Sequence, residues 1–475
     1  MCRRANICNL LSTRRILFML LVVFLVVGVD GAVADPPSDS ELSVFTRIDP
    51  PVGVVNAEGS NLVSDGDSVY MVWVESEPLR ALVGVGESAH DNPRFKKKGQ
   101  KRGGTVVHQI LFAKWNSVSG WSEARTVEQS TQVVANWADF PSLAILKGGT
   151  ILVSFPERSG GSVPYAYDVV IKASYDDGES WVRIGRPHGD LTATEHGFCS
   201  IVPAEREGGA FLFWLDGRAM APVGEGGHGD DGEMSLRSAW FHDGRIDHEK
   251  VLDRRTCECC TTDGVMAKDG SLVVYRNRDG DEVRDISIVR FAGGKWSEPV
   301  VVHHDGWVIP GCPVNGPAVD ASGNTVVVAW YTIVDGENVI NISFSRDGGR
   351  HFDEPITVDR GVGKLAPLGR VDVILDPDSD TGDAIVSWLD TDDGVGGAGV
   401  DDYDGGGAVI RVCRVRGSDG LVGEAKVVSV TSPARSSGFP MMVGVNGSLV
   451  MSWTEVGKEL TTIRAAVVGD IDMIK

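Results

Sequence analysis

Arginines are the residues best suited to chemistry in this chain, and they recur in the segments that join predicted strands. Six of them occupy such positions: Arg158, Arg218, Arg276, Arg278, Arg370 and Arg435. A guanidinium group forms paired hydrogen bonds with carboxylate or sulfate oxygens. Because the chain is acidic overall, with a formal net charge of −21, a group of arginines around one axis predicts a pocket for an anionic ligand. The alternative is that each arginine pairs with a neighbouring aspartate and joins parts of the fold.

Cysteines form a second cluster of reactive groups. Cys257, Cys259 and Cys260 lie in one short segment, and Cys312 lies in the next segment of the same kind. For a chain outside the cytoplasm, an even cysteine count favours a disulfide between Cys312 and one of the other three. The alternative is a soft-metal site for copper or zinc. Because the disulfide is preferred, no metal and no cofactor is predicted.

A repeated sheet must position these residues. An apolar run that ends in an aromatic residue recurs seven times, at intervals of about 55 to 80 residues. The seven runs are 69–73, 151–155, 210–214, 272–275, 326–330, 384–388 and 449–453. Glycine-containing turns precede most runs and alternating strands follow them, which is typical of four-stranded antiparallel units. The chain therefore predicts an all-β propeller of seven four-stranded blades, with six blades as the alternative.

The seventh unit lacks a fourth strand. The strand-like segment 41–48 belongs to no other unit, so we expect this N-terminal strand to complete the last blade and close the ring. In an antiparallel blade, the loops after the second and fourth strands share one face. The arginines and the cysteine segments fall in these loops, so this face is predicted to bind the ligand. Trp137, which can stack on a sugar ring, and Asn315 are further candidates for substrate binding.

Two segments fit the pattern Ser-x-Asp-x-Gly-x-x-Trp/Phe, namely 174–181 and 345–352. This pattern resembles the Asp-box of sialidases and related β-propellers. The resemblance covers the two boxes and the repeat architecture over most of the chain. It implies a glycoside hydrolase that binds a carboxylate through arginines and uses a tyrosine–glutamate pair as nucleophile and an aspartate as acid/base.

The same resemblance implies roles for individual residues. Asp139 is the expected acid/base, and Tyr331 with Glu195 is the expected nucleophile pair. Tyr275 and Tyr403 are alternative nucleophiles, and Glu282 is an alternative partner. The implied function is an exported sialidase-like hydrolase of an acidic or sulfated glycan. Two other hypotheses stay open: a non-catalytic propeller that binds glycan or protein, and a metal-binding propeller.

The N-terminus predicts export. Arginines precede the apolar run 16–27, and Ala32-Val33-Ala34 is typical of a cleavage site, so residues 1–34 are predicted to be a signal peptide. Residues 35–475 then form a single domain that is secreted or periplasmic. The excess of acidic residues argues against nucleic acid and anionic membrane as partners. A monomer that binds a glycan or glycoconjugate, without a membrane once the signal is removed, is expected.

Overall fold

The computed structural model describes residues 44–78, 105–160, 165–206, 208–221, 232–363, 366–377, 379, 381–392, 407–469 and 471–474. The predicted signal peptide and Tyr403 lie outside the described residues. No helix in the described part of the chain is long and apolar enough to cross a membrane.

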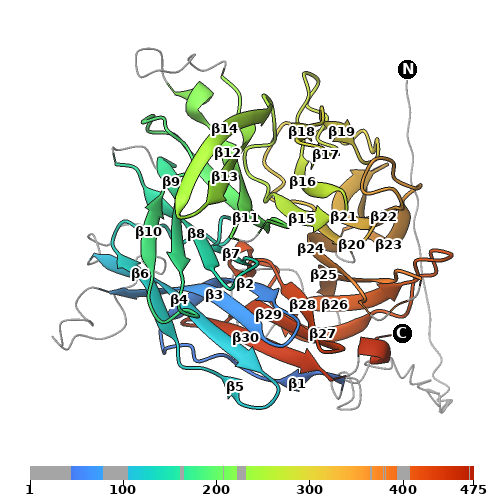
Figure 1. Ribbon diagram of the computed structural model, residues 1–475. Helices are drawn as coiled ribbons and strands as arrows, with labels where there is room; N and C mark the ends of the chain where they lie inside the picture. The colour runs from blue at the N-terminus through green and yellow to red at the C-terminus, as the bar shows by residue number, and fades with distance from the viewer. Residues whose placement is uncertain are drawn as a thin grey trace, which may run out of the picture. The chain divides into compact units, whose positions relative to one another are not determined.

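Seven antiparallel sheets follow one another along the chain and form a ring of blades (Figure 1). The first three blades are β2 (Asn56–Ser64), β3 (Val69–Pro78), β4 (Val106–Asn116), β5 (Gly120–Trp121) and β6 (Arg125–Ser130); β7 (Ser142–Ile145), β8 (Ile151–Arg158), β9 (Tyr167–Ser174) and β10 (Val182–Gly185); and β11 (His196–Pro203), β12 (Ala210–Asp216), β13 (Ser235–His242) and β14 (Arg245–Asp253). The fourth and fifth are β15 (Asp263–Ala267), β16 (Gly270–Arg276), β17 (Ile286–Ala292), β18 (Lys295–Trp296) and β19 (Val300–Val301); and β20 (Ala318–Ser322), β21 (Thr325–Val334), β22 (Glu337–Ser345) and β23 (Ile356–Gly361). The last two are β24 (Pro367–Leu375), β25 (Ala384–Asp392), β26 (Gly407–Val415) and β27 (Lys426–Thr431); and β28 (Met441–Val445), β29 (Ser448–Val456), β30 (Thr461–Val468) and β1 (Thr46–Arg47). The all-β propeller of seven blades is confirmed, and the six-bladed alternative is wrong.

The seven predicted aromatic runs are the second strands of the seven blades. They supply the largest fully buried side chains, including Trp73, Trp214, Trp330 and Trp388. These side chains fill the space between neighbouring sheets, as in any face-to-face packing of sheets. The first strands, β2, β7, β11, β15, β20, β24 and β28, contact one another in sequence around the axis.

The N-terminal strand closes the ring as predicted. Strand β1 pairs antiparallel with β30, with Thr46 opposite Val467 and Arg47 opposite Ala466. The paired segment is shorter than the predicted 41–48, although the Ile48 amide still donates to Ala465. Closure covers the outer edge of the last blade, an edge that would otherwise expose unpaired backbone groups.

The two segments that resemble Asp-boxes form the turns between the third and fourth strands of blades two and five. In the first turn, Gly178 N donates to Ser174 Oγ and Ser180 N donates to Asp176 Oδ1, each at 2.9 Å. Gly178 has a φ of +87°, which glycine adopts without strain. The equivalent turn repeats the contact between Gly349 N and Ser345 Oγ at 2.9 Å. These turns lie on the face opposite the arginine-bearing loops, so they orient the ring and hold no reactive group of the candidate site.

Three first strands carry a β-bulge where they enter the blade. The register shifts between Glu58 and Asn61, between Gly197 and Ser200, and between Gly369 and Asp372. A residue in the left-handed region lies inside each bulge, namely Gly59, Phe198 and Arg370. Bulges re-aim side chains and are common beside functional sites. These bulges therefore set the direction of the residues where the first strands begin, on the face that carries the arginine-bearing loops.

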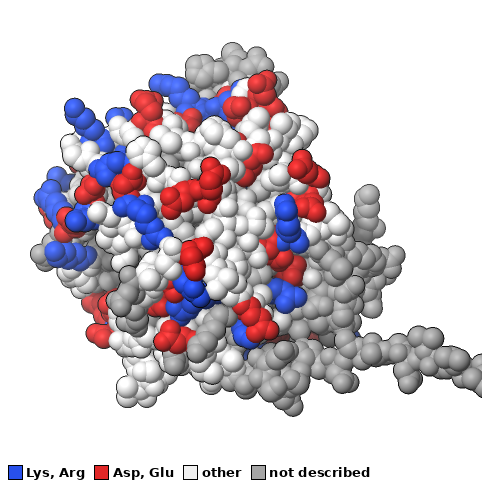
Figure 2. Space-filling view, turned by 90° about the vertical axis from the view of Figure 1, so that its right-hand side faces the viewer, with Lys and Arg blue, Asp and Glu red and all other residues white. Residues whose placement is uncertain are grey.

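Charged residues of both signs lie among one another on the face shown in Figure 2. The acidic surplus of the chain is thus not gathered into one area on that face.

Candidate functional site

A tyrosine and two carboxyl groups meet where the second and third blades adjoin. Tyr167 opens strand β9, Glu195 directly precedes β11, and Asp139 lies in the connection that leads into β7. Tyr167 Oη donates to Glu195 Oε1 at 2.6 Å. On the other side, Asp139 Oδ1 accepts the Phe198 amide at 2.9 Å. The left-handed conformation of Phe198 turns this amide toward the carboxyl group.

Glycine at position 197 leaves the space in which Asp139 and Tyr167 meet. A Cβ atom added to Gly197 would lie 2.0 Å from Asp139 Oδ2 and 2.8 Å from a ring carbon of Tyr167. Asp139 Oδ2 is buried, and no described residue offers it a hydrogen bond of normal geometry. One oxygen of Asp139 is therefore fixed by the backbone, and the other stays available beside the phenol.

Burial changes the acidity of all three groups. It raises the pKa of Asp139 to about 7, against the opposing effect of the Phe198 amide. It also raises the pKa of Glu195 to about 7, with a further contribution from the charge of Asp139. The pKa of Tyr167 rises well above 10 because the phenol is buried beside two carboxylates. Carboxyl groups with a pKa near neutrality are suited to general acid–base catalysis.

A buried network of histidines and aspartates lies beside Glu195 and includes the next residue in the chain, His196. The rings of His188 and His196 stack with centroids 4.1 Å apart. Asp190 lies 3.0 Å from His188 Nδ1 and 3.2 Å from His196 Nε2, and Asp168 lies 3.6 Å from each ring. Burial disfavours the charged form of His196, but the neighbouring carboxylates outweigh it and raise the pKa of the ring. The network fixes the backbone on which Glu195 sits, and its nitrogen and oxygen atoms lie close enough to hold a metal ion.

Two arginines without a carboxylate partner among the described residues surround one tryptophan. Arg370 and Arg435 place their guanidinium carbons 5.2 and 5.9 Å from the centre of the Trp137 ring. The ring also stacks on Phe439, with centroids 6.3 Å apart. Burial and the nearby charge of Arg435 lower the pKa of Arg370 to about 10. An anion between the two guanidinium groups would relieve this repulsion.

The bulge in β24 aims Arg370. Its Nη1 donates to Ser437 Oγ at 2.6 Å and to the carbonyl oxygens of Ala434 and Gly438 at 3.2 Å. Asn315 holds the bulge from the preceding blade, because its Oδ1 accepts the Arg370 amide at 2.8 Å. Asn315, predicted to bind substrate, thus positions an arginine through its backbone.

The other predicted arginines bond to the protein itself. Arg218 pairs with Asp216, Asp190 and Glu249. Arg278 pairs with Glu282, Glu233 and Glu258. Arg276 is fully buried and donates to the carbonyl oxygens of Asn315, Arg284 and Tyr331. These three arginines join neighbouring loops, so Arg370 and Arg435, which share the Trp137 ring, are the pair of predicted arginines left for binding an anion. No side-chain contact of Arg158 with a described residue is seen.

Tyr331 lies apart from the carboxyl pair. It belongs to β21 in the fifth blade, and its ring packs edge-on against Trp307 with centroids 5.6 Å apart. Tyr275, the alternative nucleophile, donates to Asp253 at 2.5 Å. Tyr167, which the sequence analysis did not single out, is the tyrosine that contacts Glu195. One signal could have identified it: Tyr167 opens a third strand, and third strands begin on the face that carries the ligand-binding loops.

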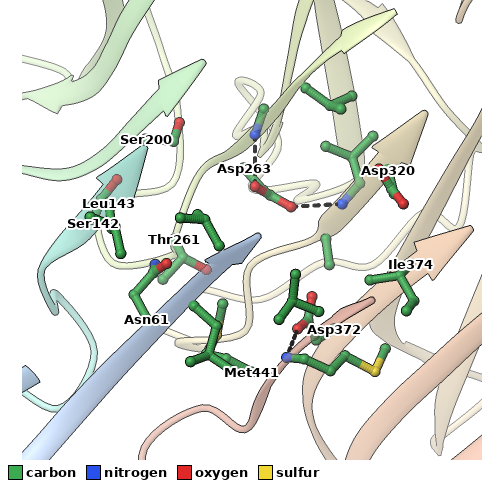
Figure 3. Close-up of a pocket in the computed structure, with 18 of the residues that line it drawn as sticks. Asn61, Ser142, Leu143, Ser200, Thr261, Asp263, Asp320, Asp372, Ile374 and Met441 are labelled. Carbon is green, nitrogen blue, oxygen red and sulfur yellow. Dashed lines mark hydrogen bonds between the residues drawn. The ribbon is translucent and has the colours of Figure 1, made fainter. Parts of the chain in front are cut away.

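A cavity of about 540 Å³ runs along the axis between the first strands (Figure 3). Asp139 and Phe140 line it, together with Asp263, Asp320 and Asp372 on the consecutive strands β15, β20 and β24. The last three accept backbone amides from the next first strand: Asp263 from Val319 at 2.8 Å, Asp320 from Leu375 at 2.7 Å and Asp372 from Met442 at 2.6 Å. Burial raises the pKa values of these three carboxyl groups to about 7, 6 and 8 respectively. They join the blades at the axis.

The six described cysteines are free thiols, so the expected disulfide is not formed in this structure. Cys257, Cys259 and Cys260 lie together, with sulfur atoms close enough to hold a metal ion. Cys413 is buried in β26, the third strand of its blade.

No family model and no curated relative matches the sequence. Similar solved structures include an ulvan lyase of a polysaccharide lyase family, which is 14% identical with a TM-score of 0.42 over 78% of this chain and 81% of that one. The α-L-arabinanase of Penicillium chrysogenum is 12% identical with a TM-score of 0.42 over 91% of this chain and 99% of that one. The intramolecular trans-sialidase of Ruminococcus gnavus is 11% identical with a TM-score of 0.43 over 88% of this chain and 95% of that one. Sialidases are thus among the structural neighbours, but identities this low do not carry an activity from one chain to another.

Proposed function

We propose that this protein is an exported, monomeric glycoside hydrolase that acts on an acidic or sulfated glycan. The observation that carries the proposal is the contact of 2.6 Å between Tyr167 Oη and Glu195, with Asp139 on the other side of the phenol. A tyrosine nucleophile with a carboxylate base and a separate acid is an established solution to glycoside hydrolysis. The predicted signal peptide of residues 1–34 supports export.

The chemistry follows from the arrangement of the three groups. Glu195 accepts the phenolic proton as Tyr167 Oη attacks the anomeric carbon. Asp139, protonated near its pKa of about 7, gives its proton to the departing glycosidic oxygen. Asp139 then takes a proton from a water molecule whose oxygen attacks the anomeric carbon. The bond between the sugar and Tyr167 Oη breaks, and Glu195 returns the proton to the phenolate. The raised pKa of Tyr167 makes this base necessary, because the phenol does not ionise unaided near neutral pH.

The substrate class follows from the residues around Trp137. Arg370 and Arg435 lie on its ring without a carboxylate partner among the described residues. Two such cations in a chain of net charge −21 favour a carboxylate or sulfate group on the bound sugar. Trp137 offers an apolar surface against which a sugar ring can stack.

A non-catalytic propeller that binds an acidic glycan is the second candidate. The specific observation in its favour is the burial of the reacting groups, since Tyr167 and Asp139 are only 2% and 3% exposed. In that case the three groups would hold blades two and three together, and only the arginine pair would meet the ligand.

Hydrolysis of a panel of sialosides, uronides and sulfated oligosaccharides by the purified protein separates the two candidates. We expect turnover of at least one substrate, and Tyr167→Phe should reduce it about 10²-fold or more. Tyr275→Phe is the matched control, because it removes a buried phenol that donates to a carboxylate at 2.5 Å outside the site. Binding without turnover would favour the second candidate, and equal turnover by both variants would overturn the assignment of Tyr167.

A further inference from the structure

Four cysteines from two successive connections meet beside the candidate site. Cys257, Cys259 and Cys260 lie between β14 and β15, and Cys312 lies between β19 and β20. The proposed hydrolysis does not use any of them. Cys257 and Cys260 are buried, Cys259 is half-buried and Cys312 is exposed. The cluster is thus buried at Cys257 and Cys260 and reaches solvent at Cys312.

The distances between the sulfur atoms match a known coordination geometry. Cys257 Sγ lies 3.8 Å from Cys259 Sγ and 3.5 Å from Cys260 Sγ. A tetrahedral zinc ion with Zn–S bonds of about 2.3 Å sets its sulfur ligands about 3.8 Å apart. The thiol of Cys312 interacts with that of Cys259, although Cys312 is outside the group of three sulfurs that all lie within 4.8 Å of one another. Three sulfur atoms are therefore placed around one position, and Cys312 can supply the fourth ligand if it moves toward them.

The surroundings of the cluster suit thiolates. Arg284, whose side chain is 4% exposed, donates from Nη1 to Cys257 Sγ at 3.1 Å. The Asn315 amide donates to Cys260 Sγ at 3.4 Å. Such N–H···S contacts orient thiolate ligands and offset the negative charge that remains when several thiolates bind one divalent ion. Protonated thiols are weak hydrogen-bond acceptors, so they would make poorer use of these two N–H donors than thiolates would.

We propose that Cys257, Cys259, Cys260 and Cys312 bind one zinc ion as four thiolate ligands. Thiolate sulfur selects soft or borderline cations, and a closed set of four cysteines is typical of a structural zinc site. The ion would tie the connection between blades three and four to the connection between blades four and five. Glu258, between the cysteines, pairs with Arg278 and Arg284, so the ion would also fix this group of charges near Glu195.

Metal analysis of the purified, reduced full chain after dialysis against zinc tests the proposal. We expect one zinc per chain, protection of four thiols from a thiol reagent, and a cobalt(II) derivative with the absorption of tetrahedral thiolate coordination. Cys257→Ser and Cys260→Ser should each lower zinc affinity at least about 10-fold. Cys413→Ser is the matched control, because this thiol is buried in β26 away from the cluster.

Three results would overturn the proposal. The first is a folded, reduced protein, checked by its β-sheet circular dichroism, that binds no zinc. The second is zinc binding that persists unchanged in both Cys257→Ser and Cys260→Ser. The third is mass spectrometry of the native protein that finds disulfides joining these cysteines. Because the readouts are metal content and thiol protection, they are independent of whether the proposed hydrolysis is observed.

Discussion

The hydroxyl of Tyr167 donates a hydrogen bond of 2.6 Å to Glu195 across the junction between the second and third blades. The backbones of the two residues are also joined there, since they form an isolated parallel bridge and Tyr167 N donates to Thr194 at 3.2 Å. The phenol and its proton acceptor are therefore fixed by main-chain contacts as well as by their own hydrogen bond. A pair held in this way needs no reorganisation before proton transfer.

The pH dependence of hydrolysis should be bell-shaped with its maximum near pH 7. Glu195 must be ionised to accept a proton, so activity falls at acidic pH, and Asp139 must be protonated to donate one, so activity falls at alkaline pH. Asp139→Asn should lower kcat about 10² to 10⁴-fold and remove the alkaline limb of the profile. Steady-state kinetics between pH 5 and pH 9, a range of roughly two units around the pKa values, measures both effects.

Asp305→Asn is the control for Asp139→Asn. Asp305 is also buried with a raised pKa, but it accepts the Trp330 indole N–H at 2.7 Å outside the site. Its substitution should leave the profile unchanged. An alkaline limb that persists in Asp139→Asn would assign the acid to another group.

Gly197→Ala should strongly reduce activity without removing any reacting group. The new Cβ would lie 2.0 Å from Asp139 Oδ2, so the carboxyl group must move away from Tyr167. Misplacement by an ångström or so commonly costs about 10²-fold in rate. Gly189→Ala, where an added Cβ meets nothing within 4 Å, provides the matched comparison. Equal kcat values for the two variants would show that Asp139 and Tyr167 need not adjoin.

Arg435→Gln should raise KM for a charged substrate with little change in kcat, because the proposed role of Arg435 is to bind the charged group of the substrate and not to take part in bond cleavage. Loss of one charge-assisted hydrogen bond predicts an increase of about 10-fold or more. Arg346→Gln removes an equally exposed arginine, which lies over Phe344 at the opposite face, and should not change KM. A neutral analogue of the substrate should bind both variants equally. The hypothesis fails if Arg435→Gln affects neutral and charged substrates alike.

The fold could be predicted almost completely from the sequence, because its signals are local. Each aromatic run, such as Val326–Trp330, carries the alternation and flanking turns of a strand within one segment. The count of seven followed from the seven aromatic runs, and the closing strand followed from one unpaired segment at 41–48. Only the length of the closing strand differed, since Thr46–Arg47 is the part that pairs.

The site could be predicted only in part, because it depends on which blades adjoin. Asp139 and Glu195 lie one blade apart and meet, whereas Tyr331 lies in the fifth blade and cannot reach them. The partners of the arginine side chains were even harder to predict from the sequence, since they depend on side-chain geometry. Arg278 meets Glu233 across 45 residues, and Arg370 lies in a left-handed bulge that no local motif indicates.

Stability should increase as the pH falls from about 8.5 to about 6, a range set by the pKa values of the three axial carboxyl groups. Asp263, Asp320 and Asp372 have folded-state pKa values of about 7, 6 and 8, all above the ordinary value of 3.8. The folded state therefore takes up protons first as the pH falls, and it gains stability over the unfolded state. Thermal unfolding at constant ionic strength measures the effect as a rise in Tm at the lower pH.

Asp372→Asn isolates one of these contributions. The variant should show a smaller rise in Tm between the two pH values, and it should not be more stable overall because the amides of Val373 and Met442 lose a carboxylate acceptor. A pH dependence identical to that of the unsubstituted chain would mean that Asp372 does not titrate in this range.

The strand that closes the ring also decides how the molecule responds to force. Strands β1 and β30 run antiparallel, and Thr46 faces Val467, so the two chain ends leave the pair at the same side. Tension applied between Thr46 and Val467 loads the few backbone bonds of this pair one after another rather than all together. Strand β1 should therefore separate from β30 at low force while the other six sheets are still intact. The ring of blades would then be open at that point.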